Sequence, residues 1–353
     1  MDQQDRSQPP QGAQPPQGPP APASPYGSPQ GPPAPGSPQG PPAPAPPQQP
    51  YGPAAYGPPP PPAPPQPYGP HYGYAWAFPH PAPPDPPELP DGASPWPRWP
   101  AWYGPAAFGV GIGVTLVAVT IVGVIAALAG ANVEDEATGA FTQIATVMQD
   151  AIFIAAAVFF AARTAPPRPW QFGLRGSRFW PAVGWAALGI VAFWIFAAVY
   201  VALVSPEGEQ GTLENLGTED SRAALIGAAV LVIVVAPVAE EFFFRGFFYR
   251  ALRTRMAVLP AALLDGALFG VIHFEGADTA EILPILAVLG VTFCLVYERT
   301  GTLFTTIALH ALNNFIAYGN GTDEWAVAGI VGATAIAGCM IVPRFLPSPA
   351  SAR

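Results

Sequence analysis

Apolar stretches of about twenty residues recur from Ala106 onward, and they constrain the fold more than any other feature of the chain. A helix of that length crosses roughly 30 Å of hydrocarbon and satisfies all of its own backbone hydrogen bonds in lipid. The sequence therefore predicts an all-α, polytopic membrane helix bundle with about eight transmembrane helices. The predicted spans are 106–131, 141–163, 181–204, 223–244, 257–274, 281–297, 302–319 and 325–343.

The first hundred residues have a different composition from the rest. They hold 39 of the 51 prolines, and no Asp, Glu, Lys or Arg occurs from Ser7 to Pro84. Such a segment cannot bury enough apolar surface to offset the entropy lost on ordering. We therefore predict a disordered Pro/Gly/Gln-rich cytoplasmic tail at 1–100, an N-terminal membrane region of three spans at 101–222, and a core of five spans at 223–345.

Arginines and acidic residues alternate along the connections between the predicted spans. All 14 basic residues are arginine, and they gather after the second, fourth, sixth and eighth spans, whereas acidic residues dominate the other connections. Because basic loops stay in the cytoplasm, both termini are predicted to be cytoplasmic. No basic, apolar leader opens the chain, so the first span is expected to insert directly and to remain.

The same features predict where the protein lies and what it does not bind. A lysine-free chain with no organelle address is expected in a bacterial plasma membrane, as an integral protein in contact with the lipid bilayer. The net charge of −9 comes from the acidic connections, and there is no basic stripe that would predict binding to nucleic acid. Oligomeric state does not follow from the pattern.

Several polar side chains interrupt the apolar core spans, where ionisable groups are costly and usually functional. They are Glu240, Glu241, His273, His310 and Asn314. On a helix, Glu241 precedes Arg245 by four residues, which is the favourable order for an ion pair. Successive residues turn by about 100°, so Glu240 points elsewhere and is available to face a cavity. A buried carboxylate without a partner suits a general base.

Two chemistries remain open for these groups. His310 and Asn314 share one face of the seventh span, and Phe269 and His273 share one face of the fifth. With Glu240 they could hold and deprotonate a water molecule and stabilise an oxyanion. Glu240, His273 and His310 could instead bind zinc and leave a position open for water, although two histidines four residues apart around a glutamate are absent. We expect no cofactor, with zinc as the alternative.

Other polar and aromatic residues in the spans are expected to be structural. Asp150 and Asp265 have no patterned partner, and Asn313 is offset by about 100° from the residue that follows it. The aromatic residues at 242–244 and 247–248 are typical of packing or lipid-facing positions.

Three motifs occur in order, each within a predicted span. They are Glu240-Glu241-Phe-Phe-Phe-Arg245-Gly246, Phe269-Gly-Val-Ile-His273 and His310-Ala-Leu-Asn-Asn314. With Tyr297-Glu-Arg-Thr-Gly301, they resemble the motif set of the CAAX protease and bacteriocin-processing family. That family contains CAAX prenyl endopeptidases of the Rce1 type and bacterial proteins with the Abi domain. The resemblance covers about residues 225–343.

The resemblance implies an intramembrane endopeptidase that hydrolyses a peptide bond of a membrane-embedded or lipidated polypeptide. It implies that Glu240 activates a water that His273 helps to hold, and that His310 and Asn314 stabilise the oxyanion. The supporting residues are then Glu241, Arg245 and Phe269. Members of the family have been called metalloproteases, and the glutamate-activated, metal-free reading is the one we favour.

Two other classes of function compete with this reading. A non-catalytic scaffold or a bacteriocin-immunity-type binding protein would keep the bundle, but it has no need for the complete polar set. A transporter would show an inverted internal repeat with broken helices, and the two halves show no such symmetry. One tension remains, since Glu240 lies near the cytoplasmic end of its span and His273 near the outer end. A shared site requires staggered or kinked helices, or different span boundaries.

Overall fold

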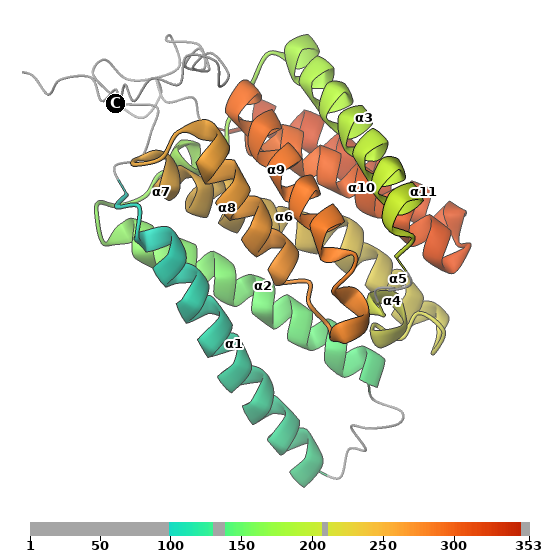
Figure 1. Cartoon of the computed structure of the whole chain (residues 1–353). Coiled ribbons are helices and arrows are strands. Elements are labelled where there is room, and N and C mark those ends of the chain that lie inside the picture. Colours follow the sequence, from blue (N-terminus) through green and yellow to red (C-terminus); the bar gives the residue numbers. More distant parts are fainter. Residues whose placement is uncertain (1–98, 130–137, 207–210, 347–353) are drawn as a thin grey trace, which may run out of the picture. The chain divides into compact units, whose positions relative to one another are not determined.

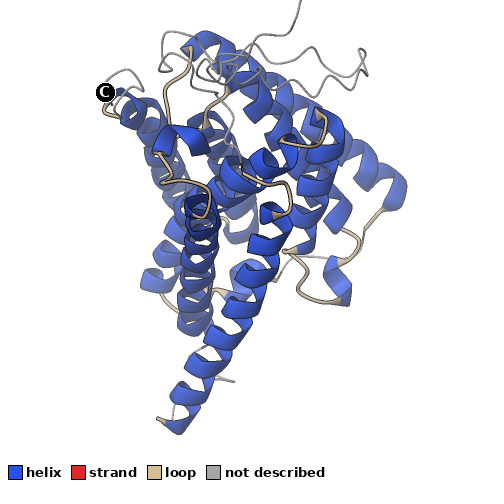
Figure 2. Ribbon diagram, turned by 90° about the vertical axis from the view of Figure 1, so that its left-hand side faces the viewer, coloured by secondary structure: helices blue, strands red, loops and turns tan. Residues whose placement is uncertain are grey.

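The computed structural model describes residues 99–129, 138–206 and 211–346, so the prediction for the tail lies almost entirely outside the described residues. All regular structure in these ranges is helical, which confirms the predicted all-α class (Figures 1 and 2). Helices α1 and α2 pack together on one flank, and α3 packs against α9 on the other (Figure 1).

Helical segments form at all eight predicted positions. The first three are α1 (Tyr103–Leu128), α2 (Thr138–Ala162) and α3 (Phe179–Val204), and the short α4 (Thr212–Asn215) precedes the fourth. The fourth contains α5 (Arg222–Val230), η3 (Leu231–Val235), α6 (Ala236–Glu241), η4 (Phe242–Tyr249) and α7 (Arg250–Arg253). The remainder are α8 (Val258–Val271), α9 (Leu283–Thr300), α10 (Leu303–Thr322) and α11 (Trp325–Ile341).

Six of the helices within the described residues are long and apolar enough to cross a membrane. The two predicted spans outside this group are α8 and α10. Helix α8 has 14 residues, which is about 21 Å of helix and less than the roughly 30 Å of hydrocarbon. Helix α10 has 20 residues but carries a histidine and several asparagines. Both pack against neighbouring helices, α8 on α9 and α10 on α11.

The fourth predicted span is longer and less regular than predicted. It runs without interruption from Arg222 to Arg253, nine residues beyond the predicted end at 244. Two π-helical segments, η3 and η4, lie on either side of α6, which carries both glutamates. Pro237 has no N–H to donate, and the wider π turn just before it accommodates a proline inside a helix. Such π segments are frequent at functional sites.

The aromatic residues of η4 form the centre of the core, which settles their predicted role as packing rather than lipid contact. Phe243, Phe244 and Phe247 are at most 1% exposed. The ring centroid of Phe243 lies 4.6 Å from that of Phe153 on α2, and the centroid of Phe244 lies 5.4 Å from that of Phe269 on α8. These contacts fix the rotation of the fourth helix, and therefore the directions in which its two glutamates point.

A buried polar network joins the ends of several helices. Glu298 of α9 accepts from Arg253 Nη2 at 2.7 Å and from Tyr249 Oη at 2.9 Å. Arg175, in the connection before α3, donates from Nε to the carbonyl oxygen of Gly301 at 2.7 Å. The C-terminal ends of α7 and α9 therefore lie at the same end of the bundle.

Candidate functional site

The predicted pair of Glu241 and Arg245 forms at the centre of the bundle. Arg245 Nη1 donates to Glu241 Oε1 at 3.0 Å, and both side chains are fully buried. Arg245 Nη2 donates to the carbonyl oxygen of Gly290 at 2.8 Å, and its Nε lies 3.6 Å from Asp265 Oδ1. Asp265 was predicted to be structural, and its carboxylate faces the buried guanidinium of Arg245. A guanidinium suits this position because its planar fork can serve several acceptors at once.

Aromatic rings complete the surroundings of Arg245. Its guanidinium carbon lies 4.5 Å from the centroid of Phe269, 5.0 Å from that of Phe293 and 5.6 Å from that of Phe244. A cation over the face of an aromatic ring is attracted by the ring quadrupole, by about 2 kcal/mol when water is excluded. The rings and the acceptors together hold the arginine in one orientation.

His310 lies between the two glutamates. Its Nδ1 is 3.2 Å from Glu241 Oε1, and its Nε2 is 3.9 Å from Glu240 Oε2. Its ring packs on Phe293, with centroids 4.9 Å apart, and is edge-on to Phe269 at 5.7 Å. Sequence spacing could not show the contact with Glu241, because the two residues are 69 positions apart and on different helices.

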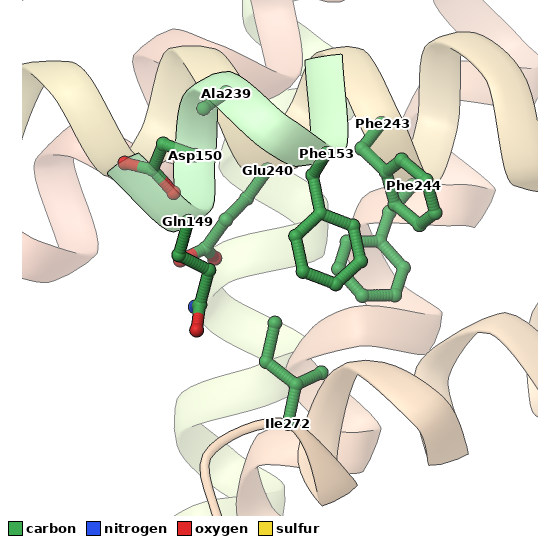
Figure 3. A pocket seen from close by; sticks show the side chains of 8 residues that line it. All are labelled: Gln149, Asp150, Phe153, Ala239, Glu240, Phe243, Phe244 and Ile272. Carbon is green, nitrogen blue, oxygen red and sulfur yellow. The ribbon is translucent and has the colours of Figure 1, made fainter. Parts of the chain in front are cut away.

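Glu240 differs from Glu241 in its exposure, as the helical offset predicts. Its side chain is 15% exposed, whereas that of Glu241 is fully buried. It lines a small pocket (Figure 3). The lining residues are Gln149, Asp150, Phe153, Ala239, Glu240, Phe243, Phe244 and Ile272. Glu240 Oε2 has no hydrogen-bond partner among the described residues.

Asn314 holds the π-helical segment that precedes the glutamates. In η3, the N–H of Ala236 donates to the carbonyl oxygen of Leu231, five residues back, and not to that of Val232. The next residue, Pro237, has no N–H. Val232 is left without a helical donor, and Asn314 Nδ2 fills that role at 2.9 Å. Asn313, which was predicted to lie outside the site, donates from Nδ2 to Asn314 Oδ1 at 3.3 Å.

His273 lies next to Phe269, one turn after it. Its Nδ1 is 2.7 Å from the carbonyl oxygen of Phe269, and a carbonyl can only accept, so Nδ1 carries the hydrogen. The other ring nitrogen, Nε2, is then an acceptor in the neutral imidazole. The Phe269 ring lies between the two histidines, with its centroid 4.9 Å from that of His273 and 5.7 Å from that of His310. None of the contacts described for residues 211–346 joins His273 directly to Glu240.

The arrangement of these groups does not fit zinc. Across residues 99–129, 138–206 and 211–346, no set of three His, Cys, Asp or Glu side chains is placed to hold a metal ion. The candidate ligands Glu240, His273 and His310 are among the residues searched. Glu241 and Arg245 instead occupy the neighbourhood of His310.

The longer fourth helix changes the distances of the site residues from the ends of their helices. Glu240 lies 13 residues before Arg253, or about 20 Å from that end of the helix at 1.5 Å per residue. His273 lies 15 residues after Val258, the start of α8, or about 22 Å, and His310 lies about 10 Å from the start of α10. The different boundary places Glu240 and His273 at similar distances along their helices, whereas His310 lies about 10 Å nearer to the start of its own helix.

Comparisons with known proteins bear on the same segment. Residues 222–316 match the family described as type II CAAX prenyl endopeptidase Rce1-like. Over this segment the chain is similar to that family. The match confirms the resemblance predicted from the motifs, and it contains every predicted site residue from Glu240 to Asn314. It excludes α1, α2 and α3.

Two proteins of Bacillus subtilis (strain 168) resemble the chain. "Putative membrane peptidase YdiL" is 29% identical over 169 residues, which cover 44% of this chain and 63% of that protein. "Uncharacterized protein YyaK" is 33% identical over 95 residues, which cover 26% of this chain and 32% of that protein. The chain thus spans less than two thirds of the length of either relative. No solved structure matches it.

Proposed function

We propose that this integral membrane protein is an intramembrane endopeptidase in which Glu240 activates water. The observation that carries the proposal is the asymmetry between the two glutamates. Glu241 is fully buried and engaged by Arg245 and His310, whereas the Glu240 side chain is 15% exposed and lines a pocket. One carboxylate organises the site, and the other is available as a base.

The reaction follows from these positions. Glu240 takes a proton from a water molecule as the water oxygen attacks the carbonyl carbon of the scissile bond. Negative charge develops on the carbonyl oxygen, and His310 with a hydrogen on both ring nitrogens stabilises it by donating from Nε2, which lies on the side of Glu240, while Nδ1 donates to Glu241. Glu240 then gives its proton to the leaving amine nitrogen as the C–N bond breaks. His273, whose ring packs against Phe269, supports the site from the side next to His310.

Asn314 has a different part in this proposal from the one that the family resemblance implies. Its amide nitrogen donates to Val232, so the amide holds the π segment that places Glu240. A direct donation to the oxyanion would require that this bond be released. Glu241, Arg245 and Phe269 support His310 in this proposal.

The surroundings of the pocket favour a substrate that reaches the site from the membrane. Its walls come from α2, from the fourth helix and from the end of α8, and most of the lining side chains are apolar. Glu240 lies about 20 Å from the end of its own helix. We therefore infer that the substrate is a membrane-embedded or lipidated polypeptide.

Comparative proteomics of membranes tests the proposal. Cells that carry the wild-type chain are compared with cells that carry Glu240→Gln or His310→Ala, with Glu219→Gln on an exposed connection as the matched control. We expect one or more membrane polypeptides to accumulate uncleaved in both site variants and not in the control. If every polypeptide is processed normally in both variants, the protease proposal fails and a non-catalytic scaffold or binding protein takes its place.

A further inference from the structure

Asp150 is a buried ionisable residue that the mechanism above does not use. It lies on α2, outside the segment that matches the Rce1-like family. Its side chain is only 6% exposed, and Oδ2 has no hydrogen-bond partner among the described residues. A buried carboxylate without a partner is costly, because its hydration is lost and nothing replaces it.

The Asp150 side chain lines the same pocket as Glu240 (Figure 3). The two carboxyl groups and the amide of Gln149 gather at one end of this pocket, away from the phenyl rings of Phe153, Phe243 and Phe244. Both carboxyl groups keep one oxygen without a protein partner. Two acceptor oxygens from different helices therefore face one small space with apolar walls.

A structural polar residue on the same helix has quite different contacts. Gln143 lies seven residues before Asp150, and therefore on nearly the same face of α2. Its Nε2 donates to the carbonyl oxygens of Leu216 at 2.8 Å and of Ala224 at 3.0 Å, and these bonds attach α2 to the segment before and within α5. Asp150 Oδ2 makes no such attachment, so the predicted structural role leaves its position unexplained.

A water molecule has two hydrogens, and a carboxylate offers only acceptors. A water that donates one hydrogen to Glu240 and the other to Asp150 directs its lone pairs away from both. We propose that Asp150 is a positioning residue, which accepts the second hydrogen of the water that Glu240 deprotonates. This inference rests on the proposed endopeptidase function and adds α2 to the site.

An electron pair on the water oxygen forms the new C–O bond, and the pair of the C=O π bond moves to the carbonyl oxygen. One water proton passes to Glu240, and the other stays on the oxygen, hydrogen-bonded to Asp150. When the C–N bond breaks, the proton on Glu240 passes to the amine nitrogen. The products are a carboxylic acid and an amine, and Asp150 is unchanged.

The test uses the full chain in lipid nanodiscs and a fluorogenic peptide that spans the cleavage site found by the proteomic comparison. Wild type, Asp150→Asn, Glu240→Gln and the structural control Gln143→Leu are compared for kcat, KM and thermal unfolding. We expect Asp150→Asn to lower kcat by about tenfold to a hundredfold, the range that follows a small misplacement of a reacting group, with KM within about twofold. Its Tm should not fall, because no protein hydrogen bond of Oδ2 is lost.

Gln143→Leu is expected to give the opposite result, with a lower Tm and an unchanged kcat per folded molecule. A second variant, Asp150→Ala, distinguishes loss of the carboxylate from a packing defect. Added formate should restore part of the kcat of Asp150→Ala and should have no effect on Gln143→Leu.

An unchanged kcat for Asp150→Asn, or a loss that only follows a lower Tm, would overturn the assignment of Asp150. So would an Asp150→Ala variant that formate does not rescue. These outcomes differ from failure of the endopeptidase proposal itself, in which Glu240→Gln would cleave the peptide as fast as wild type.

Discussion

Glu241 on the fourth helix and His310 on α10 are joined by a contact of 3.2 Å between Oε1 and Nδ1. The same glutamate oxygen accepts from Arg245 Nη1 at 3.0 Å. A carboxylate at Nδ1 fixes both the orientation of an imidazole and the nitrogen that carries the hydrogen. It thereby directs Nε2 of His310 toward Glu240, which lies 3.9 Å away.

Substitution of Glu241 should lower the stability of the protein, whereas substitution of Glu240 should abolish cleavage without lowering stability. Glu241→Gln leaves the buried charge of Arg245 without its closest carboxylate, and breaking a buried ion pair costs about 3–5 kcal/mol. Glu240→Gln removes a charge whose Oε2 has no protein partner, so its Tm should equal or exceed that of wild type while cleavage is lost. Thermal unfolding in a single detergent measures both variants. Equal losses of Tm would contradict the division of roles.

Arg245→Lys should destabilise the protein although the charge is kept. An ammonium cannot reproduce the fork that serves Glu241 and the Gly290 carbonyl together. An acceptor left buried and unpaired costs about 1–3 kcal/mol. The measurement is the free energy of unfolding in detergent. Arg344→Lys, at the surface near the C-terminus, serves as the control and should change little; an equal effect of the two substitutions would refute the geometric argument.

Asn314→Asp should weaken the π-helical segment before the glutamates. An ionised carboxylate cannot donate to the Val232 carbonyl, which has no other donor within its helix. We expect a loss of about 1–3 kcal/mol of stability and a lower kcat as Glu240 moves. Asn313→Ala, which removes only the 3.3 Å contact to Asn314, is the comparison and should cost less. Hydrogen exchange at 231–236 would show the local opening directly.

The predicted orientation of the membrane spans can be tested by labelling. Each variant carries one cysteine, in place of Ser205 or of Arg255, in a chain whose Cys294 and Cys339 have been replaced by alanine. The two positions lie in connections on opposite sides of the predicted bundle. If both termini are cytoplasmic, a membrane-impermeant maleimide added to intact cells should label the cysteine at 205 and leave the one at 255 unlabelled. Labelling at 255 alone would reverse the assigned orientation.

The sequence predicted those features that depend only on residues close together along the chain. Apolar runs of about twenty residues predicted the helices, because the length needed to cross the hydrocarbon is a property of one segment. The pair of Glu241 and Arg245 followed from a spacing of four residues on one helix. The motif set also predicted the Rce1-like resemblance, which the match to residues 222–316 confirms.

The C-terminal end of the fourth helix could not be predicted from the sequence in the same way. The run of aromatic residues and arginines after 244 has no clear apolar signature, yet the chain continues as helix to Arg253. Buried partners on α9 make this possible, since Glu298 accepts from Arg253 and Tyr249. Helix formation there depends on tertiary contacts rather than on local hydropathy.

The sequence by itself determined the helical class, the approximate positions of the helical segments, the offset between Glu240 and Glu241 and which residues are candidates for the site. Only the tertiary structure decided how the helices face one another. It placed His310 against Glu241, Asp150 beside Glu240, and Asn314 on the Val232 carbonyl. The physical reason is that spacing along a helix fixes which residues share a face, whereas packing of large side chains fixes what that face meets.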